Sequence, residues 1–172
     1  TFETVSGPVT GRFVDGSPEI DMVPVTELAP EWNTPLLPGE QRIGYARVGV
    51  PHLVVLVPDV DLIDVYHRGK ELRHLESLRH GANANFVSRG ADGHWSMRTY
   101  ERGVEEETLA CGTGSVACAA LLTSWGLAPG RVTLTTRSGR DLTATVGERP
   151  EQGTPVLAGE GRIVFEGSLR EI

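Results

Sequence analysis

The sequence lacks the features typical of secreted, membrane-spanning and nucleic-acid-binding proteins. It has 2 cysteines in 172 residues and a formal net charge of -7. That charge argues against a nucleic-acid surface, which needs clustered lysine and arginine. The strongly apolar run LVVLV at residues 53–57 is far too short to span a bilayer. We therefore expect a cytoplasmic protein that binds neither nucleic acid nor membrane.

The two cysteines, Cys111 and Cys118, lie seven residues apart on one expected helix. Seven helical residues rise about 10 Å, whereas a disulfide needs Cα atoms within about 7 Å of each other. The two thiols therefore cannot pair, and a reducing compartment is expected. No cluster of cysteine and histidine has the spacing of zinc ligands, so no metal site is expected.

Strands outnumber helices in the pattern of apolar and β-branched residues. Two helices are expected, at 61–78 with a break at Gly69 and at 112–126 with Gly126 as the C-cap. Because strands and helices do not alternate regularly, the pattern predicts an α+β fold with a mainly antiparallel sheet. The expected strands are 1–6, 9–14, 18–23, 43–48, 53–57, 82–88, 94–101, 131–136, 141–146 and 155–166.

A weak internal repeat links two parts of the chain. TVSGPVTGRFV at 4–14 resembles TRSGRDLTATV at 136–146, around the hairpin turn expected at Ser138–Gly139. The chain also opens on Thr1 within an expected strand, so we expect sequence before it. By the logic of the repeat, that sequence carries a second cysteine followed by a helix. The proline-rich segment 24–41 predicts a connector between two lobes.

Cys111 stands where an expected turn becomes the helix that begins with Gly112-Thr113-Gly114. A helix N-terminus presents unpaired backbone N–H groups and the positive end of the helix dipole. These features lower the pKa of a cysteine and can also hold a carboxylate. A thiolate beside a carboxylate site suits chemistry at the α-carbon of an amino acid. The structural alternative is a small residue at a tight turn.

Three segments carry a resemblance to a known family. RTYERGVEEETLACGTGSVACAA at 98–120 resembles the second cysteine motif of the diaminopimelate epimerase family. GVPHLVVLVPDV at 49–60 and ELRHLESLRHGANANFV at 71–87 resemble the same family in the expected order. The resemblance covers essentially the whole chain but only the latter part of the family's protein. It implies an epimerase without a cofactor, built as two lobes that are each a barrel-like sheet around a central helix.

The resemblance also implies catalytic roles for individual residues. Cys111 matches the proton-transferring thiol of the second lobe, and His52 matches a histidine near the reacting carbon. Glu101 and Arg102 match an acidic and basic pair that contacts substrate and supports the thiols.

The substrate-binding residues follow in the same way. The resemblance implies that Asn83 and Arg102 bind substrate and that the backbone of Gly112 and Thr113 binds its α-carboxylate. Val50 departs from the family, which often has asparagine before its Pro-His pair, so the recognition of the distal group of the substrate is open.

Several of these residues also have a structural interpretation. His52 precedes a buried-looking strand and is equally well read as a core histidine. Asn83 and Asn85 share one face of an expected strand, and their alternative role is to form a turn. The acidic run 105–107 predicts an exposed loop, and Cys118, among alanines, predicts a packed core residue.

Inversion of an α-carbon needs one proton-transfer group on each face of that carbon. Cys118 lies two turns along the same helix and cannot be the second group. The chain is therefore expected to hold half of a site. Residues 1–24 are expected to be the remnant of a first lobe, 25–160 the cysteine-bearing lobe, and 161–172 a terminal strand returning to the first lobe.

The resemblance implies that the reaction is the interconversion of LL- and meso-diaminopimelate, a step toward lysine and cell-wall precursors. The expected partners are this diamino dicarboxylate, the missing N-terminal lobe and a second copy in a homodimer. Two other functions stay open. One is a hydrolase or transferase that uses Cys111, His52 and an asparagine, and the other is a lobe that binds an amino acid without catalysis.

Overall fold

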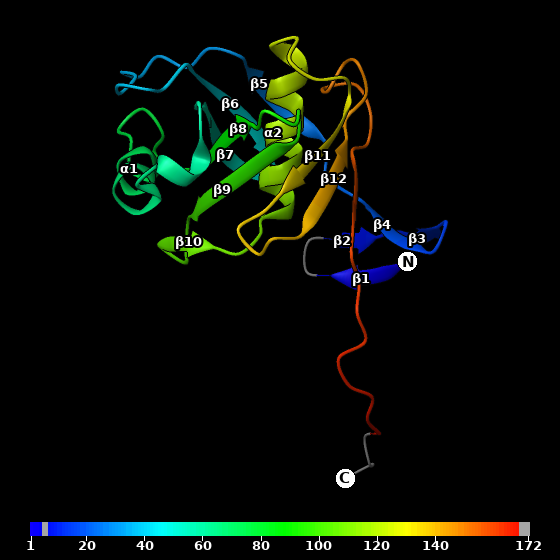
Figure 1. Ribbon diagram of the computed structural model, residues 1–172. Coiled ribbons are helices and arrows are strands. Elements are labelled where there is room, and N and C mark those ends of the chain that lie inside the picture. The colour runs from blue at the N-terminus through cyan, green and yellow to red at the C-terminus, as the bar shows by residue number, and fades with distance from the viewer. Residues whose placement is uncertain (5–6, 169–172) are drawn as a thin grey trace.

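The computed structural model describes residues 1–4 and 7–168 of the chain. A mixed sheet wraps around one helix, and a second helix packs on the outside of the sheet (Figure 1). The helices are α1 (Val65–Arg73) and α2 (Gly112–Ser124), with a 3-10 turn at Val60–Leu62. The strands are β1 (Phe2–Thr4), β2 (Gly7–Val9), β3 (Gly11–Val14), β4 (Ser17–Asp21), β5 (Val25–Ala29), β6 (Arg42–Val48), β7 (Val50–Leu56), β8 (Asn83–Arg89), β9 (Trp95–Glu101), β10 (Glu106–Thr108), β11 (Arg131–Thr135), β12 (Asp141–Thr145) and β13 (Val156–Gly159).

The strand order of the main sheet is β3-β4-β13-β12-β11-β9-β8-β7-β6-β5, with β10 paired to β9 off this path. Neighbours are antiparallel except for β7 with β8 and β9 with β11. Within the described residues, β3 and β5 are the edge strands of this sheet, which encloses α2 without closing into a barrel. The predicted α+β fold, with a mainly antiparallel sheet around a central helix, is confirmed.

Helix α2 is enclosed because its side chains are small. Every residue from Gly114 to Leu122 is buried, and the helix packs against strands β5, β6, β7, β8, β11, β12 and β13. The helix ends as predicted, with Gly126 at φ +71° and its N–H donating to the Thr123 carbonyl at 2.9 Å. Within the described residues, no helix is long and apolar enough to cross a membrane.

The continuous apolar run of β7 reflects burial on both faces of the sheet. Val54 and Leu56 join the cluster around α2, whereas Leu53 and Val55 join the cluster under α1. Side chains alternate across a strand, so a strand covered on both sides needs apolar residues at successive positions. Strands β6 to β9 thus form a layer between the two helices.

Two segments expected to lack regular structure contain strands. The predicted connector 24–41 holds β5, which pairs with β6 and buries Val25. The acidic run 105–107 contributes to β10, where Glu107 accepts two hydrogen bonds from Arg98, both at 2.7 Å. In both cases the segment forms a strand because it pairs with a neighbouring strand, and local composition does not reveal that pairing.

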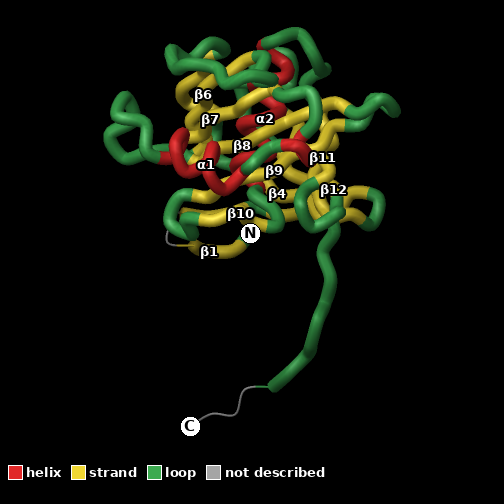
Figure 2. Tube along the Cα trace, turned by 60° about the vertical axis from the view of Figure 1, so that its left-hand side comes forward, coloured by secondary structure: helices red, strands yellow, loops and turns green. Residues whose placement is uncertain are grey.

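The C-terminal part of the predicted strand 155–166 is not a strand. Strand β13 ends at Gly159, and residues 161–168 run away from the body of the molecule without regular structure (Figure 2). Phe165 is 83% exposed there, because no neighbouring strand pairs with this segment in the described chain. The expected strand at 161–172 extends beyond the described residues, as does part of the repeat at 4–14, so the proposed division into lobes stays a prediction.

Helix α1 is shorter than predicted and has no break at Gly69. It begins after Asp64, whose carboxylate accepts a hydrogen bond from the His67 N–H at 3.1 Å. Gly69 is buried against Tyr100, and a Cβ there would lie 2.4 Å from the Tyr100 Cβ. This glycine therefore serves close packing of α1 on the sheet.

We expect Gly69→Ala to lower the free energy of unfolding by about 1–2 kcal/mol, since the clash with Tyr100 outweighs the higher helix propensity of alanine. Urea unfolding, followed by circular dichroism, measures the change. The control is Lys70→Ala at the next, exposed position, which should change stability by no more than about 0.5 kcal/mol. A Gly69→Ala protein at least as stable as the parent would contradict the packing role.

Candidate active site

Cys111 is the N-cap of α2, as the sequence predicts. Its backbone is extended, at φ -137° and ψ 109°, and its carbonyl accepts the Ser115 N–H at 2.9 Å. The Cys111 sulfur accepts the Gly114 N–H at 3.3 Å and lies 3.6 Å from the Thr113 hydroxyl. The thiol is thus held against the open N–H groups of the first helical turn.

The first turn of α2 is crowded by protein atoms. A Cβ at Gly114 would lie 2.5 Å from Asn85 Oδ1 and 3.1 Å from the Cys111 sulfur. A Cβ at Gly112 would lie 2.8 Å from a Leu157 methyl group. These glycines let β8 and β13 approach the backbone of the first turn closely.

Burial raises the pKa of the Cys111 thiol above its ordinary value. The Thr113 hydroxyl and the Gly114 N–H lower this pKa, while the negative charge of Glu101 raises it. The expectation of a lowered pKa is therefore wrong for the described chain. The helix N-terminus acts in the expected direction, but the loss of solvent around the sulfur outweighs it.

Three neighbouring strands place polar side chains beneath the start of α2. His52 on β7 lies opposite Asn83 on β8, and Asn85 on β8 lies opposite Thr99 on β9. All four side chains are buried, and His52 is 0% exposed. Burial and the positive charge of Arg102 lower the pKa of His52 to about 3, so its ring is neutral.

Asn85 connects these groups, although its role was not predicted. Its Nδ2 donates to the Leu53 carbonyl at 2.9 Å and lies 3.3 Å from His52 Nδ1. Its Oδ1 accepts the Thr99 hydroxyl at 2.9 Å. The Asn-Ala-Asn spacing at 83–85 was the available signal, because it places both amides on one strand face.

The end of β9 joins the remaining candidates to this group. The Arg102 N–H donates to Asn83 Oδ1 at 2.8 Å, and its guanidinium donates to the His80 carbonyl at 3.3 Å. Glu101 is close enough to Cys111 to influence its pKa. The structure thus joins Arg102 to Asn83 by a hydrogen bond and places Asn83 opposite His52 on the paired strand. Cys111, Gly112 and Thr113 lie together at the start of α2.

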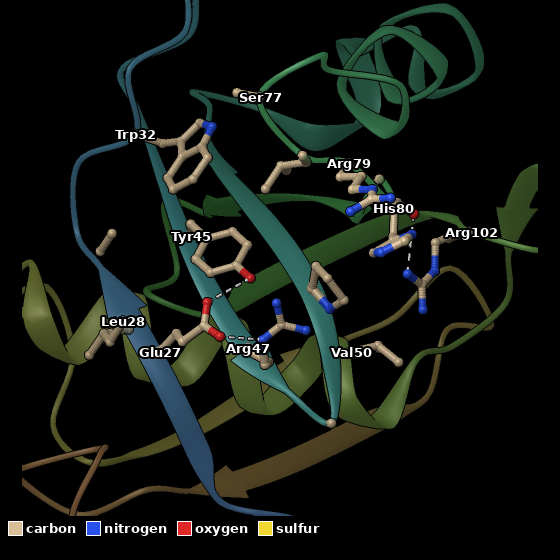
Figure 3. Close-up of a pocket in the computed structure, with 15 residues that line it drawn as sticks. Glu27, Leu28, Trp32, Tyr45, Arg47, Val50, Ser77, Arg79, His80 and Arg102 are labelled. Atoms are coloured by element: carbon tan, nitrogen blue, oxygen red, sulfur yellow. Dashed lines mark hydrogen bonds and ion pairs between the residues drawn. The ribbon is translucent and has the colours of Figure 1, made fainter.

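A cavity of about 530 Å³ opens on the face of β6 opposite α2 (Figure 3). Trp32 and Tyr45 stack in it, with ring centroids 4.8 Å apart. Val50 and Arg102 line one end of this cavity, but neither Cys111 nor His52 lines it. The cavity therefore reaches Arg102 but does not reach the Cys111 thiol.

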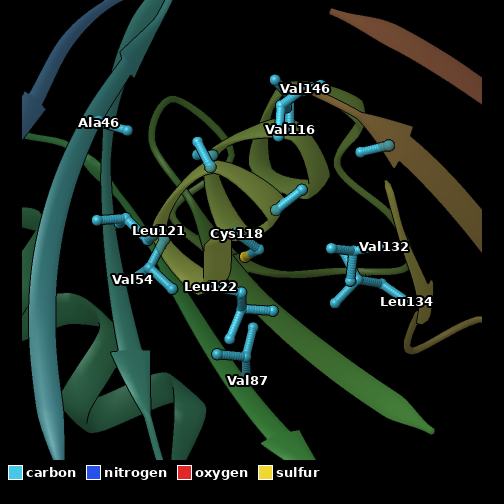
Figure 4. Packing of buried hydrophobic residues seen from close by; sticks show 14 of the residues in the cluster. Ala46, Val54, Val87, Val116, Cys118, Leu121, Leu122, Val132, Leu134 and Val146 are labelled. Carbon is cyan, nitrogen blue, oxygen red and sulfur yellow. The ribbon is translucent and has the colours of Figure 1, made fainter. Parts of the chain in front are cut away.

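Cys118 has no place in this site. It is 0% exposed and packs among the leucines and valines around α2 (Figure 4). Burial raises the pKa of its thiol well above the ordinary value. Both cysteines are free thiols, and the prediction that Cys118 is a packed core residue is confirmed.

Solved structures with this fold include epimerases and racemases. A Bacillus anthracis phenazine biosynthesis protein of the PhzF family superposes with a TM-score of 0.66 at 12% identity, over 91% of this chain and 63% of that chain. A probable proline racemase from Agrobacterium radiobacter superposes with a TM-score of 0.61 at 20% identity, over 92% of this chain and 57% of the racemase. At such identities these matches show the fold alone.

Sequence comparison is more specific. Residues 44–164 match the family model for diaminopimelate epimerase. The diaminopimelate epimerase of Gemmatimonas aurantiaca is 47% identical over 96% of this chain and 63% of its own length. That of Aquifex aeolicus is 39% identical over 99% of this chain and 61% of its own length. The chain spans about three fifths of these relatives, and it belongs to the diaminopimelate epimerase family.

Proposed function

We propose that the chain carries one of the two proton-transfer groups of an amino-acid epimerase that works without a cofactor. The substrate is diaminopimelate, which the enzyme interconverts between its LL and meso forms. The observation that carries this proposal is the placement of Cys111 at the buried N-terminus of α2, with its sulfur receiving the Gly114 N–H at 3.3 Å. Family membership supports the choice of reaction and substrate.

In this proposal the Cys111 thiolate removes the α-proton from one face of the substrate, or its thiol delivers a proton to that face in the reverse direction. The Gly114 N–H and the Thr113 hydroxyl stabilise the thiolate. The backbone N–H groups of Gly112 and Thr113 bind the α-carboxylate at the positive end of α2. Asn83 and Arg102, which are linked by a hydrogen bond, bind the rest of the substrate.

The second proton-transfer group comes from outside this chain. Cys118 is enclosed in the core on the same helix as Cys111 and cannot reach the opposite face of a shared carbon. The relatives are longer than this chain, which covers 63% and 61% of them. We infer that the remaining part of such a protein supplies the second thiol and closes the site over the substrate.

The geometry does not favour a cysteine hydrolase. That chemistry needs a histidine hydrogen-bonded to the nucleophilic sulfur. Among the described residues, the Cys111 sulfur bonds to Thr113 and Gly114, while the hydrogen bond of His52 goes to Asn85.

The completed protein is this chain fused to the part of the Gemmatimonas aurantiaca relative that it does not cover. In the completed protein, Cys111→Ser should lower kcat for inversion about 10²- to 10⁴-fold, because a hydroxyl is a poor acid and base at neutral pH. Chiral chromatography of the product measures the rate. Cys118→Ser is the matched control on the same helix and should retain kcat while losing stability. A folded Cys118→Ser protein without activity, or a Cys111→Ser protein with undiminished activity, would contradict the assignment.

The chain of residues 1–172 should not invert diaminopimelate, since it offers a thiol to one face of the α-carbon only. Fusing it to the part of the Gemmatimonas aurantiaca relative that it does not cover should produce inversion in D2O, with deuterium at the α-carbon. Mass spectrometry and chiral separation report both results. Sustained inversion by the 172-residue chain would rule out the half-site.

A further inference from the structure

His52 is a buried imidazole with one nitrogen occupied and the other without a partner. Its Nδ1 lies 3.3 Å from Asn85 Nδ2. Its Nε2 is buried and has no hydrogen-bond partner within the described part of the chain. Buried polar atoms without hydrogen-bond partners are rare in native proteins, and each one needs a structural or functional explanation.

The surroundings of Asn85 decide where the imidazole carries its proton. The Leu53 carbonyl can only accept a hydrogen bond, so the Asn85 group that faces it at 2.9 Å must be the NH2 group. The Thr99 hydroxyl donates to Oδ1 on the other side at 2.9 Å. The amide is therefore fixed, and its NH2 group faces His52.

An amide NH2 group donates and cannot accept. His52 Nδ1 must therefore present its lone pair to Asn85, and the proton of a neutral ring must lie on Nε2. The lowered pKa of His52 agrees with a neutral ring. The unpartnered Nε2 is then a hydrogen-bond donor.

We propose that Asn85 is a positioning residue that fixes His52 as the Nε2–H tautomer, so that His52 enters the reaction as a hydrogen-bond donor and not as the base. The tautomer follows from the contacts of Asn85 alone. Its use in the reaction rests on the proposed function, and on the position of His52 beside Asn83 on the paired strand.

The same amide constrains the thiol side of the site. A Cβ at Gly114 would lie 2.5 Å from Asn85 Oδ1, and the Gly114 N–H is the group that donates to the Cys111 sulfur. Asn85 thus lies between the imidazole and the first turn of α2. One side chain sets the protonation of His52 and packs against the glycine that holds Cys111.

The tautomer can be observed directly in the chain labelled with 15N-histidine. Long-range 1H–15N correlation spectra distinguish a ring nitrogen that bears a proton from one that does not, and His52→Gln assigns the signal among the 5 histidines. We expect Nε2 of His52 to bear the proton. A His52 signal from the Nδ1–H tautomer, or from an even mixture, would overturn the proposal.

Two variants test whether Asn85 is the cause. In Asn85→Asp the NH2 donor becomes an acceptor, so the proton should move to Nδ1 of His52. Ser88→Ala is the control on the same strand, since Ser88 is also buried and bonds to Val60 instead of His52; it should leave the Nε2–H tautomer unchanged. A folded Asn85→Asp protein that keeps the Nε2–H tautomer would refute the role of Asn85. If this variant does not fold, the tautomer observed in the parent protein alone decides whether the proposal stands.

Kinetics of the completed protein separate this proposal from the function on which it rests. Asn85→Asp should lower kcat at least tenfold, and Ser88→Ala should not. An unchanged kcat in an Asn85→Asp protein whose tautomer has moved would overturn the use of this donor in the reaction. A completed parent protein without epimerase activity would overturn the proposed function, while the spectra would still decide the tautomer.

Discussion

Helix α2 can be enclosed by strands because its residues are small, and the geometry of the candidate site depends on that close approach. At Gly114 there is no room for a Cβ between Asn85 and the Cys111 sulfur. The thiol, the amide beneath it and the helix N-terminus are therefore fixed by the packing of the core. A site built on packed elements holds its groups more rigidly than one built on mobile loops.

The same enclosure sets the electrostatics of the site. Burial raises the pKa of Cys111 and lowers that of His52, so it disfavours the charged form of both side chains in the described chain. Hydrogen bonds from the first turn of α2 partly restore the thiolate of Cys111.

The sequence predicted what is encoded locally and missed what depends on distant partners. Cys111 at the start of α2 was predictable because the glycines and the apolar run that follow it are contiguous. Strand 25–29 was missed because its pairing with β6 decides it. Gly69 was read as a helix break because its partner, Tyr100, lies far along the chain. The role of Asn85 needs the spatial neighbours of its amide, which spacing alone does not supply.

The central claim is that Cys111 serves one face of the α-carbon and a group outside this chain serves the other. The most direct measurement follows deuterium uptake at the α-carbon of each stereoisomer, without inversion, by a completed protein carrying Cys111→Ala. The remaining group can still remove a proton from one stereoisomer and return deuterium to the same face. Our account predicts exchange with that stereoisomer and none with the other. Equal exchange with both stereoisomers, or inversion at the parent rate, would contradict it.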